Sequence, residues 1–316
     1  MWRIKSVDIS GLLGRYNIHW DLDSNVNILG GGNGSGKSTL LKAILMQFSP
    51  ADQSGRIVIH SEAVFGNIHS ELQNGYRMNV DKSVKLSNKT SEIDGHKTIT
   101  EEEEVSLKIS SIVPDDFAYD KQKGPTVIYV NSIEANVRHA NSILSNSSMK
   151  ERPATSMLDL LIENSLNKRN AIFSELMSKA IDSGDDKEMK RVQDLFGRFS
   201  KVLKEFMPDY SIQNMSTLTF KIKDVPEESI RYFKLSSGEK QLIYLLLTIA
   251  NTMGEPTIAL LDEADMGMHV DWKRMLLKKM LEVNPNMQII ASTHSPALID
   301  GWRDNVKEIS ELCVNA

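Results

Sequence analysis

A glycine-rich loop carries the residues whose types and spacing best fit chemistry on phosphate. Residues 31–38 read Gly-Gly-Asn-Gly-Ser-Gly-Lys-Ser and match the pattern G-x-x-x-x-G-K-[ST]. Glycines let backbone N–H groups close around phosphate oxygens, and a helix beginning here adds its positive end. The cation of Lys37 would reach the β- and γ-phosphates, and the hydroxyl of Ser38 would coordinate Mg²⁺. The candidate phosphate-binding residues are Gly31, Asn33, Gly34, Ser35, Gly36, Lys37, Ser38 and Thr39.

Two adjacent carboxylates follow an apolar segment later in the chain. Residues 257–261 read as a buried strand, and Asp262 and Glu263 come at its end. At the carboxyl edge of a sheet that also holds a phosphate loop, Asp262 can orient the hydration shell of Mg²⁺. Glu263 can polarise an attacking water. The order of a phosphate loop followed by this acidic pair favours a catalytic site over an acidic turn.

A third segment begins a strongly apolar helix. Residues 235–241 read Leu-Ser-Ser-Gly-Glu-Lys-Gln, in which Ser236 and Glu239 form the capping pattern S-x-x-E. One interpretation is only a well-capped helix. The other is that Ser237, Gly238 and the free N–H groups of the helix start bind a γ-phosphate. The residues alone leave both open.

A histidine, His294, ends a further apolar strand over residues 287–292. A lone histidine is more often structural than functional. This strand is expected to lie in the same sheet as the acidic pair, which would bring His294 to the same edge.

Apolar periodicity predicts an α/β protein with three parts. Strand signals at residues 4–9, 25–29 and 126–130 alternate with the helix after the phosphate loop. Between residues 56 and 111 we expect an antiparallel meander with separate strands at 78–80 and 84–86 and turns at Asn74-Gly75 and Asp94-Gly95. The acidic run at 101–104 is expected to be a solvated edge that discourages pairing. β structure is expected to return at residues 216–222.

Residues 155–206 change to helical spacing, with a break at Ser183-Gly-Asp-Asp186. Between Glu151 and Met207 there are ten acidic and ten basic side chains, with no stripe of one sign evident along the sequence. A packed helical hairpin with mixed solvated faces is therefore favoured over a DNA-binding arm.

Composition excludes several classes of protein. The 316 residues carry a formal net charge of −5, which argues against a globally basic nucleic-acid coat. The one cysteine, Cys313, cannot form an internal disulfide and fits a reducing compartment. No apolar stretch is long enough to span a membrane, and the first residues lack a signal-peptide core. We therefore expect a cytoplasmic protein that is not inserted in a membrane.

These motifs, in this order, resemble the ATP-binding-cassette (ABC) ATPases, and within them the soluble SMC and RecF-type branch. The closing residues Thr293-His-Ser-Pro296 are similar to the OLD and PtuA-type ATPases of bacterial antiphage systems. The resemblance implies a P-loop fold with an antiparallel β-subdomain and a helical insertion. Its expected divisions are a first ATPase lobe at 1–135, a helical insert at 136–210 and a second ATPase lobe at 211–316.

The resemblance also implies roles for residues and partners. ATP and Mg²⁺ would be held by the phosphate loop and Asp262, Glu263 would activate water, and His294 would sense the γ-phosphate. Ser237 and Gly238 would complete the site of a facing subunit, so a head-to-tail homodimer holding two ATP molecules is expected. Only 22 residues follow His294, so a separate effector protein, such as a nuclease, is expected to carry any further chemistry.

The chain departs from the resemblance at two places. After Glu263 it reads Ala-Asp-Met-Gly-Met-His269-Val, which keeps a histidine but lacks two prolines of the OLD-like pattern. The glutamine expected after the second core strand is not obvious, and Asn131 is its positional substitute. Arg15 and Tyr16 are candidates to flank the adenine base, with an ordinary surface turn as the alternative.

Three rival functions remain open at this point. The chain could be a RecF-like clamp on DNA, a transporter cassette, or a nucleotide-locked scaffold that does not hydrolyse ATP. Nucleic acid is also a possible partner of the defence-type ATPase.

Overall fold

The computed structural model describes residues 2–48, 56–58, 67–73, 77–93, 96–112, 125–131, 156–225 and 229–314. At its centre is a parallel sheet with the strand order β14-β3-β13-β12-β8. Every residue of its three central strands is buried, which is why these strands appear in the sequence as continuous apolar runs. The bounds are β3 Val26–Gly30, β8 Thr126–Asn131, β12 Thr257–Asp262, β13 Met287–Ser292 and β14 Val306–Glu308.

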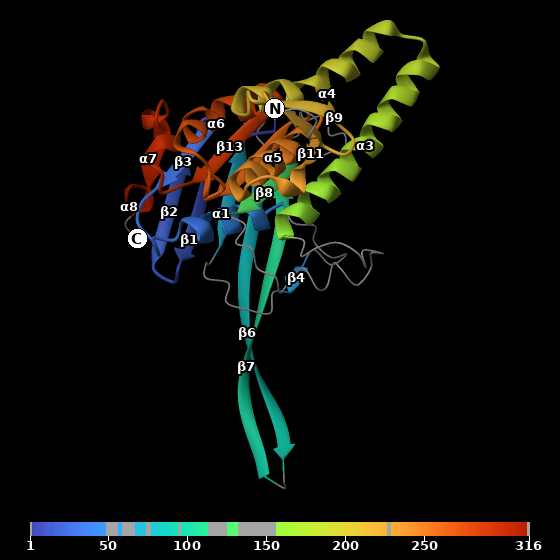
Figure 1. The fold of residues 1–316 in the computed structure, drawn as a ribbon. Helices are drawn as coiled ribbons and strands as arrows, with labels where there is room; N and C mark the ends of the chain where they lie inside the picture. Colours follow the sequence, from blue (N-terminus) through green and yellow to red (C-terminus); the bar gives the residue numbers. More distant parts are fainter. Residues whose placement is uncertain are drawn as a thin grey trace.

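Alternate residues of the parallel strands separate two hydrophobic cores. Ile258 and Leu260 of β12 face helix α1 (Lys37–Met46) and the second sheet, whereas Ala259 and Leu261 face α5 (Ser237–Ala250) and α6 (Val270–Val283). The sheet is thus covered on both sides, as a parallel sheet requires. Figure 1 shows α1 and α5 beside the sheet, with the C-terminal elements at its far edge. These last elements are α7 Pro296–Ile299, η2 Arg303–Asn305 and α8 Ile309–Leu312.

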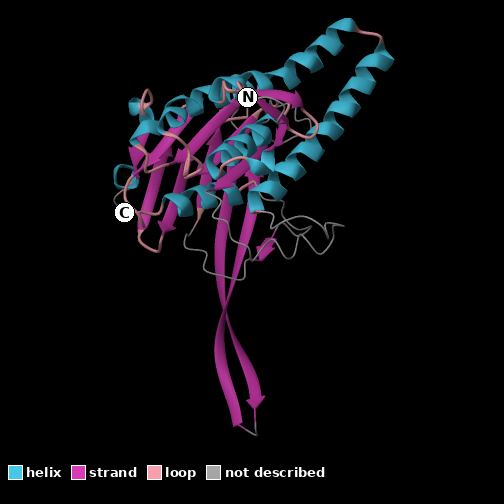
Figure 2. Ribbon diagram, in the orientation of Figure 1, coloured by secondary structure: helices cyan, strands magenta, loops and turns pink. Residues whose placement is uncertain are grey.

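The second sheet is antiparallel, with the order β2-β1-β5-β6-β7-β4. Its bounds are β1 Ile4–Leu12, β2 Tyr16–Asp21, β4 Arg56–Val58, β5 Ile68–Leu72, β6 Arg77–Ile93 and β7 His96–Ile112. The predicted α/β class and the antiparallel subdomain are confirmed. Strands β6 and β7 form a long two-stranded ribbon that extends away from the body (Figure 2).

Two details of the predicted meander are wrong. Residues 78–80 and 84–86 belong to one continuous strand, β6, because the polar residues between them are extended rather than turned. The acidic run 101–104 lies inside β7 and pairs with residues 85–88 of β6, so it does not prevent pairing on that side. The predicted turns at 74–75 and 94–95 lie outside the described residues.

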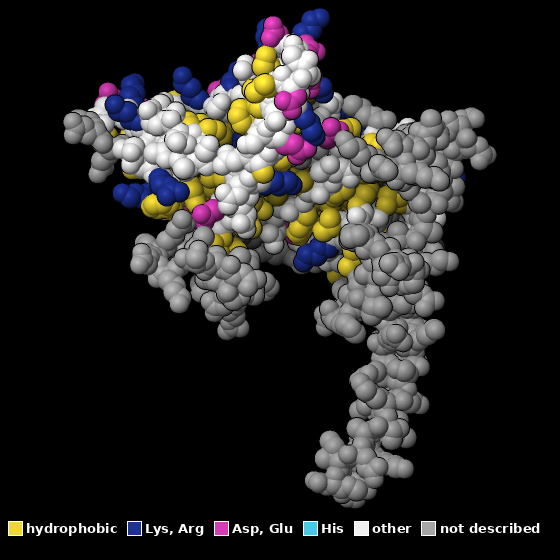
Figure 3. All heavy atoms as spheres, turned by 90° about the vertical axis from the view of Figure 1, so that its right-hand side faces the viewer, with side chains coloured by type: hydrophobic (Ala, Val, Ile, Leu, Met, Phe, Trp, Pro, Cys, Tyr) yellow, Lys and Arg dark blue, Asp and Glu magenta, His cyan; other side chains and the backbone are white. Residues whose placement is uncertain are grey.

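The helical hairpin is formed by α3 (Met157–Ser183) and α4 (Asp186–Phe206). The chain reverses at Gly184, whose φ of 65° is a left-handed conformation that glycine adopts readily. Both helices contact α5 at their base, and Figure 1 shows their tip projecting beyond the body. Figure 3, seen from this side, shows acidic and basic side chains interspersed on the protruding hairpin.

A small antiparallel sheet follows the hairpin, and its strands are β9 Tyr210–Asn214, β10 Thr219–Ile222 and β11 Ser229–Arg231. The strand predicted at 216–222 is therefore shorter, since Met215–Leu218 form the turn from β9 to β10. A 3₁₀ turn, η1 (Tyr232–Lys234), leads from this sheet into α5. No helix among the described residues combines the length and apolar character that spanning a membrane requires.

Candidate functional site

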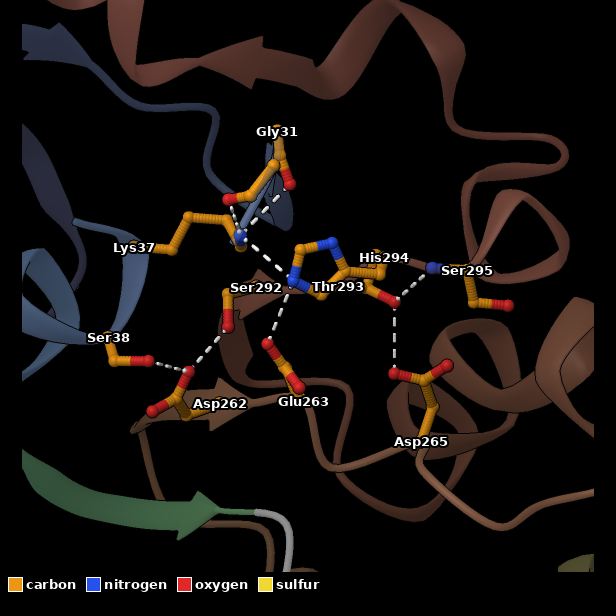
Figure 4. A network of polar contacts seen from close by, with 11 residues as sticks. Gly31, Lys37, Ser38, Asp262, Glu263, Asp265, Ser292, Thr293, His294 and Ser295 are labelled. Carbon is orange, nitrogen blue, oxygen red and sulfur yellow. Dashed lines mark hydrogen bonds and ion pairs between the residues drawn. The ribbon is translucent and has the colours of Figure 1, made fainter. Parts of the chain in front are cut away.

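The parallel register of three strands gathers the predicted site residues at one edge of the sheet. Asp262, at the end of β12, is opposite Ser292 at the end of β13, and Ser292 is opposite Leu29 near the end of β3. The three loops that follow these strands therefore leave the sheet side by side. The loop after β3 is the glycine-rich loop, the loop after β12 begins with Glu263, and the loop after β13 contains His294, as Figure 4 shows.

The glycine-rich loop has a backbone that only glycine adopts without strain at several positions. The φ angles are 121° at Gly31, 72° at Gly34 and 99° at Gly36. A Cβ atom on Gly36 would lie 3.0 Å from the side chain of Leu13, so the turn after β1 packs against the end of the loop. The φ angle and the close approach together account for glycine at position 36.

Lys37 folds back over this loop. Its Nζ donates to the carbonyl oxygens of Gly31 and Gly32, at 3.0 and 2.9 Å, and lies 3.1 Å from Nε2 of His294. Burial lowers the pKa of the ammonium group, while the charges of Glu263 and Asp262 act in the opposite direction. The cation is therefore desolvated and aimed at the space the loop surrounds.

Asp262 is held by three hydroxyl groups. Its Oδ1 accepts from Ser38 Oγ at 2.9 Å and from Ser292 Oγ at 2.7 Å, and its Oδ2 accepts from Tyr129 OH at 2.9 Å. Burial, together with the Asp262 charge, raises the pKa of Tyr129, which keeps this phenol protonated as a donor. Tyr129 and Ser292 were missed in the sequence because nothing in their own segments indicates the distant carboxylate they contact.

Glu263 adopts a left-handed backbone conformation with φ of 52°. Its amide donates to the carbonyl of Ser292 at 3.1 Å, and its Oε1 lies 3.0 Å from Nε2 of His294. Backbone strain of this kind at a non-glycine residue clusters at functional sites. The strained turn directs the carboxylate toward the histidine of the neighbouring loop.

His294 presents one ring nitrogen to two different groups. Nε2 is 3.1 Å from the Lys37 ammonium, to which it can only be an acceptor, and 3.0 Å from the Glu263 carboxylate, to which it can only be a donor. One nitrogen cannot do both at once. The tautomer of His294 therefore decides whether Nε2 accepts a hydrogen bond from Lys37 or donates one to Glu263.

Asp265 is a buried residue of the site that the sequence did not reveal. Its Oδ1 accepts from Thr293 Oγ1 at 3.0 Å, and its Oδ2 lies 3.0 Å from Lys273 Nζ. The side chain of Asp265 is 3% exposed, so the ion pair is shielded from water. Asp265 lies in the loop that follows Glu263, and this hydrogen bond holds Thr293, the residue before His294, in place.

The segment before α5 forms the predicted cap. Ser236 Oγ accepts from the amide of Glu239 at 3.3 Å, and the Glu239 carboxylate accepts from the Ser236 amide at 2.7 Å. A Cβ atom on Gly238 would lie 2.5 Å from the carbonyl oxygen of Gly267, so the loop after Glu263 packs directly on this helix start. Among the described residues, Ser237 and Gly238 make no polar contact with Lys37, Asp262 or Glu263.

The remaining candidates lie around this edge. Asn131, at the end of β8, is opposite Asp262 in the sheet register, so it lies beside the acidic pair. The guanidinium of Arg15 stacks over the Tyr16 ring at 4.8 Å, in the turn that packs on the glycine-rich loop. His269 caps α6, its Nδ1 accepting from the amide of Asp271 at 3.3 Å.

The donor set fits a nucleoside triphosphate with Mg²⁺. Ser35 Oγ is buried without a hydrogen-bond partner within the loop, and the ammonium of Lys37 is bonded to neutral groups that phosphate oxygens could replace. Mg²⁺ is usually held by one or two protein oxygens together with water and phosphate. The adjacent oxygens of Ser38 and Asp262 supply this number.

A parallel sheet, a helix-starting glycine loop and this acidic pair define an ATPase of the P-loop class with an ABC-type head. The chain belongs to the AAA_21 family, described as "AAA domain, putative AbiEii toxin, Type IV TA system", whose model matches residues 26–300. Membership confirms the resemblance predicted from the motifs.

Named relatives and a solved structure are consistent with this class. The chain is 23% identical to the "Retron Vc95 probable ATPase" of Vibrio cholerae serotype O1 biovar El Tor, over 92% of this chain and 70% of that protein. It is 22% identical to the "Septu protein PtuA" of Bacillus thuringiensis, over 94% of this chain and 72% of that protein. An SMC head bound to the C-terminal winged-helix domain of ScpA matches with a TM-score of 0.50 and 16% identity, covering 96% and 93% of the two chains. This last likeness concerns the fold alone.

Proposed function

We propose that this chain hydrolyses ATP, with Mg²⁺, as the regulatory subunit of a bacterial antiphage defence complex. One observation carries the catalytic part: His294 Nε2 lies within 3.1 Å of both the Lys37 cation and the Glu263 carboxylate. Three loops far apart in the sequence thus converge where a γ-phosphate would meet water. Two relatives are named as a retron probable ATPase and a Septu protein, which supports the defence role.

Each residue of the converging loops has a role in this proposal. The loop amides of residues 31–36 and the Lys37 ammonium bind the phosphates, and Thr39 lies toward the α-phosphate. Ser38 and Asp262 position Mg²⁺, which neutralises charge on the phosphates when bound. Asn131 lies beside them in place of the expected glutamine.

Glu263 is the general base that orients and polarises the attacking water. His294 detects the γ-phosphate by exchanging its contact with Lys37 or Glu263 for one with a phosphate oxygen. Because the His294 tautomer selects between these two partners, the histidine can couple nucleotide binding to the position of the Glu263 carboxylate.

The site is completed by a second copy of the chain. Within one chain, Ser237 and Gly238 are not joined to the phosphate loop by any polar contact among the described residues, although they begin a helix with free N–H groups. A head-to-tail homodimer would place this helix start against the phosphates held by its partner. Two ATP molecules would then lie between the protomers, and further assembly of such dimers is compatible with this arrangement.

A separate effector protein, such as a nuclease, carries the defence chemistry in this proposal. The ATPase lobes at 1–135 and 211–316 form the nucleotide-binding body in the cytoplasm, and the insert at 136–210 presents a surface to partners. The alternative is an SMC- or RecF-like clamp that maintains DNA without an effector. Purification with the products of the neighbouring genes distinguishes them, since a co-purifying effector supports the first and bound DNA alone supports the second.

The direct test is the Glu263→Gln variant. The amide keeps the shape of the side chain but cannot act as a base, so we expect the ATPase rate to fall about 100-fold or more while ATP binding persists. Phosphate release and retained nucleotide would be measured together. Glu175→Gln, which removes a carboxylate exposed on α3, is the matched control and should leave both unchanged. An unaltered rate in Glu263→Gln would contradict the catalytic assignment.

A further inference from the structure

The outer face of α4 carries a dense row of cations that the sequence did not reveal. The apolar side of α4 faces the core through Val192, Phe199, Val202, Leu203 and Phe206. With 3.6 residues per turn, these buried side chains cover about 100° of the helix circumference, so the outward face is broad. The basic residues on this face are Lys187, Lys190, Arg191, Arg198, Lys201 and Lys204.

These cations are largely unneutralised. Glu205 is paired with Lys279 of α6, and Glu188 makes only an exposed contact of 3.5 Å with Arg191. No ion pair is found for the other five basic residues of this set within the described part of the chain. Asp186 and Asp194 are the acidic side chains on this face that have no such pairing there. A chain with a net charge of −5 therefore concentrates positive charge on one helix face.

The balanced count of ten acids and ten bases concealed this separation. Asp159 is buried against α5, away from the α4 face, whereas Asp185 caps the start of α4 beside Lys187. Glu175 is paired with Lys179 on the surface of α3. The hairpin surface is mixed in charge, as expected, but on α4 six basic residues stand against four acidic ones.

Part of this face lines a hollow. Lys187, Lys190, Arg191 and Arg198 surround a cavity of about 430 Å³ whose other wall is the loops at Met253–Gly254 and Pro285–Asn286. These two loops are joined, because Asn286 Nδ2 donates to the carbonyl of Gly254 at 2.8 Å. Four cations and one acid, Asp194, thus line a concave site with a fixed wall, which suits an anionic group.

The chemistry of the face favours nucleic acid over an acidic protein. Protein interfaces have an apolar, aromatic-rich centre, whereas nucleic-acid interfaces are polar and strongly positive. The large exposed hydrophobic side chains of the hairpin, Phe173 and Ile181, are on α3 and not on α4. At 1.5 Å per residue, the row from Lys187 to Lys204 is about 25 Å long, enough to follow several consecutive phosphates.

We propose that the cationic face of α4 binds the sugar-phosphate backbone of a nucleic acid, with the hollow beside Gly254 receiving phosphate groups. This surface is separate from the ATP site and does not depend on ATP hydrolysis. DNA and RNA both present a sugar-phosphate backbone, so the experiment below determines which of the two binds more tightly.

The test uses the full chain and a fluorescein-labelled 30-nucleotide DNA strand, the RNA of the same sequence, and the DNA duplex. Anisotropy is recorded from 50 to 300 mM NaCl. We expect binding that weakens with salt, and Lys190→Ala/Lys201→Ala should weaken it about 10-fold. Loss of two phosphate contacts on a single strand should lower the slope of log K against log salt by about 1.4. The probe bound more tightly identifies the strand type.

Lys168→Ala/Lys179→Ala is the matched control, since it removes two lysines from the other helix of the same hairpin. Photo-cross-linking of the unmodified chain to a bromouracil-containing strand gives a second readout and should label peptides of residues 187–204. Equal affinity in the two double variants would overturn the proposal. So would cross-links confined to other segments, no binding at 50 mM NaCl, or equally effective competition by polyglutamate of the same charge.

Discussion

Glu263 and its neighbours are held by contacts between residues that are far apart in the sequence. At Glu263, where φ is 52°, the backbone N–H donates a hydrogen bond to the carbonyl oxygen of Ser292, and Asp262 accepts from hydroxyls of three other segments. Such pre-positioning means that the groups need not reorganise during the reaction. The residues therefore act as one unit. The loss of ATPase rate in a double variant is expected to differ from the sum of the losses in the two single variants.

Gly238 offers a test at the scale of one atom. A Cβ at this position would lie 2.5 Å from the carbonyl oxygen of Gly267, so Gly238→Ala must displace the loop that follows Glu263. We expect unfolding free energy to fall by about 1–3 kcal/mol and the ATPase rate to fall with it. Urea unfolding and phosphate release measure the two effects.

Gly197→Ala on α4 is the matched control. A Cβ there meets no atom of the described residues within 4 Å, so the substitution should raise stability by about 0.4–1 kcal/mol and leave the ATPase rate unchanged. If Gly238→Ala behaved like Gly197→Ala, the tight packing of the helix start on this loop would be refuted.

The sequence predicted the site residues that belong to local motifs and missed those that act across the fold. The glycine loop, Asp262, Glu263 and His294 each come with a recognisable pattern in their own segment. Tyr129 and Asp265 do not, because their partners are Asp262 and Thr293 on other strands and loops. Their roles depend on strand register, which one sequence does not specify.

At the scale of elements, a buried ion pair joins the helical hairpin to the helix that begins with Ser237. Asp159, at the start of α3, lies 2.9 Å from Lys240 of α5, and both side chains are about one-tenth exposed. The other oxygen of Asp159 accepts from the amide and hydroxyl of Ser156, which fixes the start of α3. The hairpin and the start of α5 are thus directly connected.

Breaking this pair should be costly. Asp159→Asn leaves the Lys240 cation buried without its counter-charge, and we expect a loss of about 3–5 kcal/mol in unfolding free energy. The double variant Asp159→Leu/Lys240→Met should recover most of that loss, since apolar replacement of a buried pair is often neutral. Denaturant unfolding gives both values.

The exposed pair Glu175–Lys179 on α3 provides the comparison, and Glu175→Gln should cost less than about 1 kcal/mol. A similar small cost for Asp159→Asn would show that the α3–α5 connection does not contribute to folding.

Helices and strands were predicted best where a regular apolar pattern extended over many residues. The two hairpin helices and their break at Gly184 match the sequence pattern closely, since each buries a regular apolar face. The strand β6 was predicted as two pieces because Asp81-Lys-Ser83 looks like a turn in isolation. Pairing with β7 along its whole length keeps it extended instead.

At the scale of the whole molecule, the chain presents one phosphate-binding edge, one separate helix start and two projections, the β6–β7 ribbon and the α3–α4 hairpin (Figure 1). Within one copy, the described residues of the helix start, Ser237 and Gly238, make no polar contact with Lys37, Asp262 or Glu263. In the proposed symmetric pair, the helix start of each copy would face the phosphate loop of the other, so two composite sites would form. The projections would then extend from a body whose shape depends on bound ATP.

Mixing two inactive variants tests this central claim most directly. Lys37→Ala disables the phosphate loop, and Ser237→Arg blocks the helix start. In a mixed dimer one of the two composite sites is intact. We predict that each variant alone is inactive and that an equimolar mixture recovers up to about a quarter of the ATPase rate of the unmodified chain. A mixture that stays inactive at every ratio, or full activity of Ser237→Arg alone, would contradict the shared site.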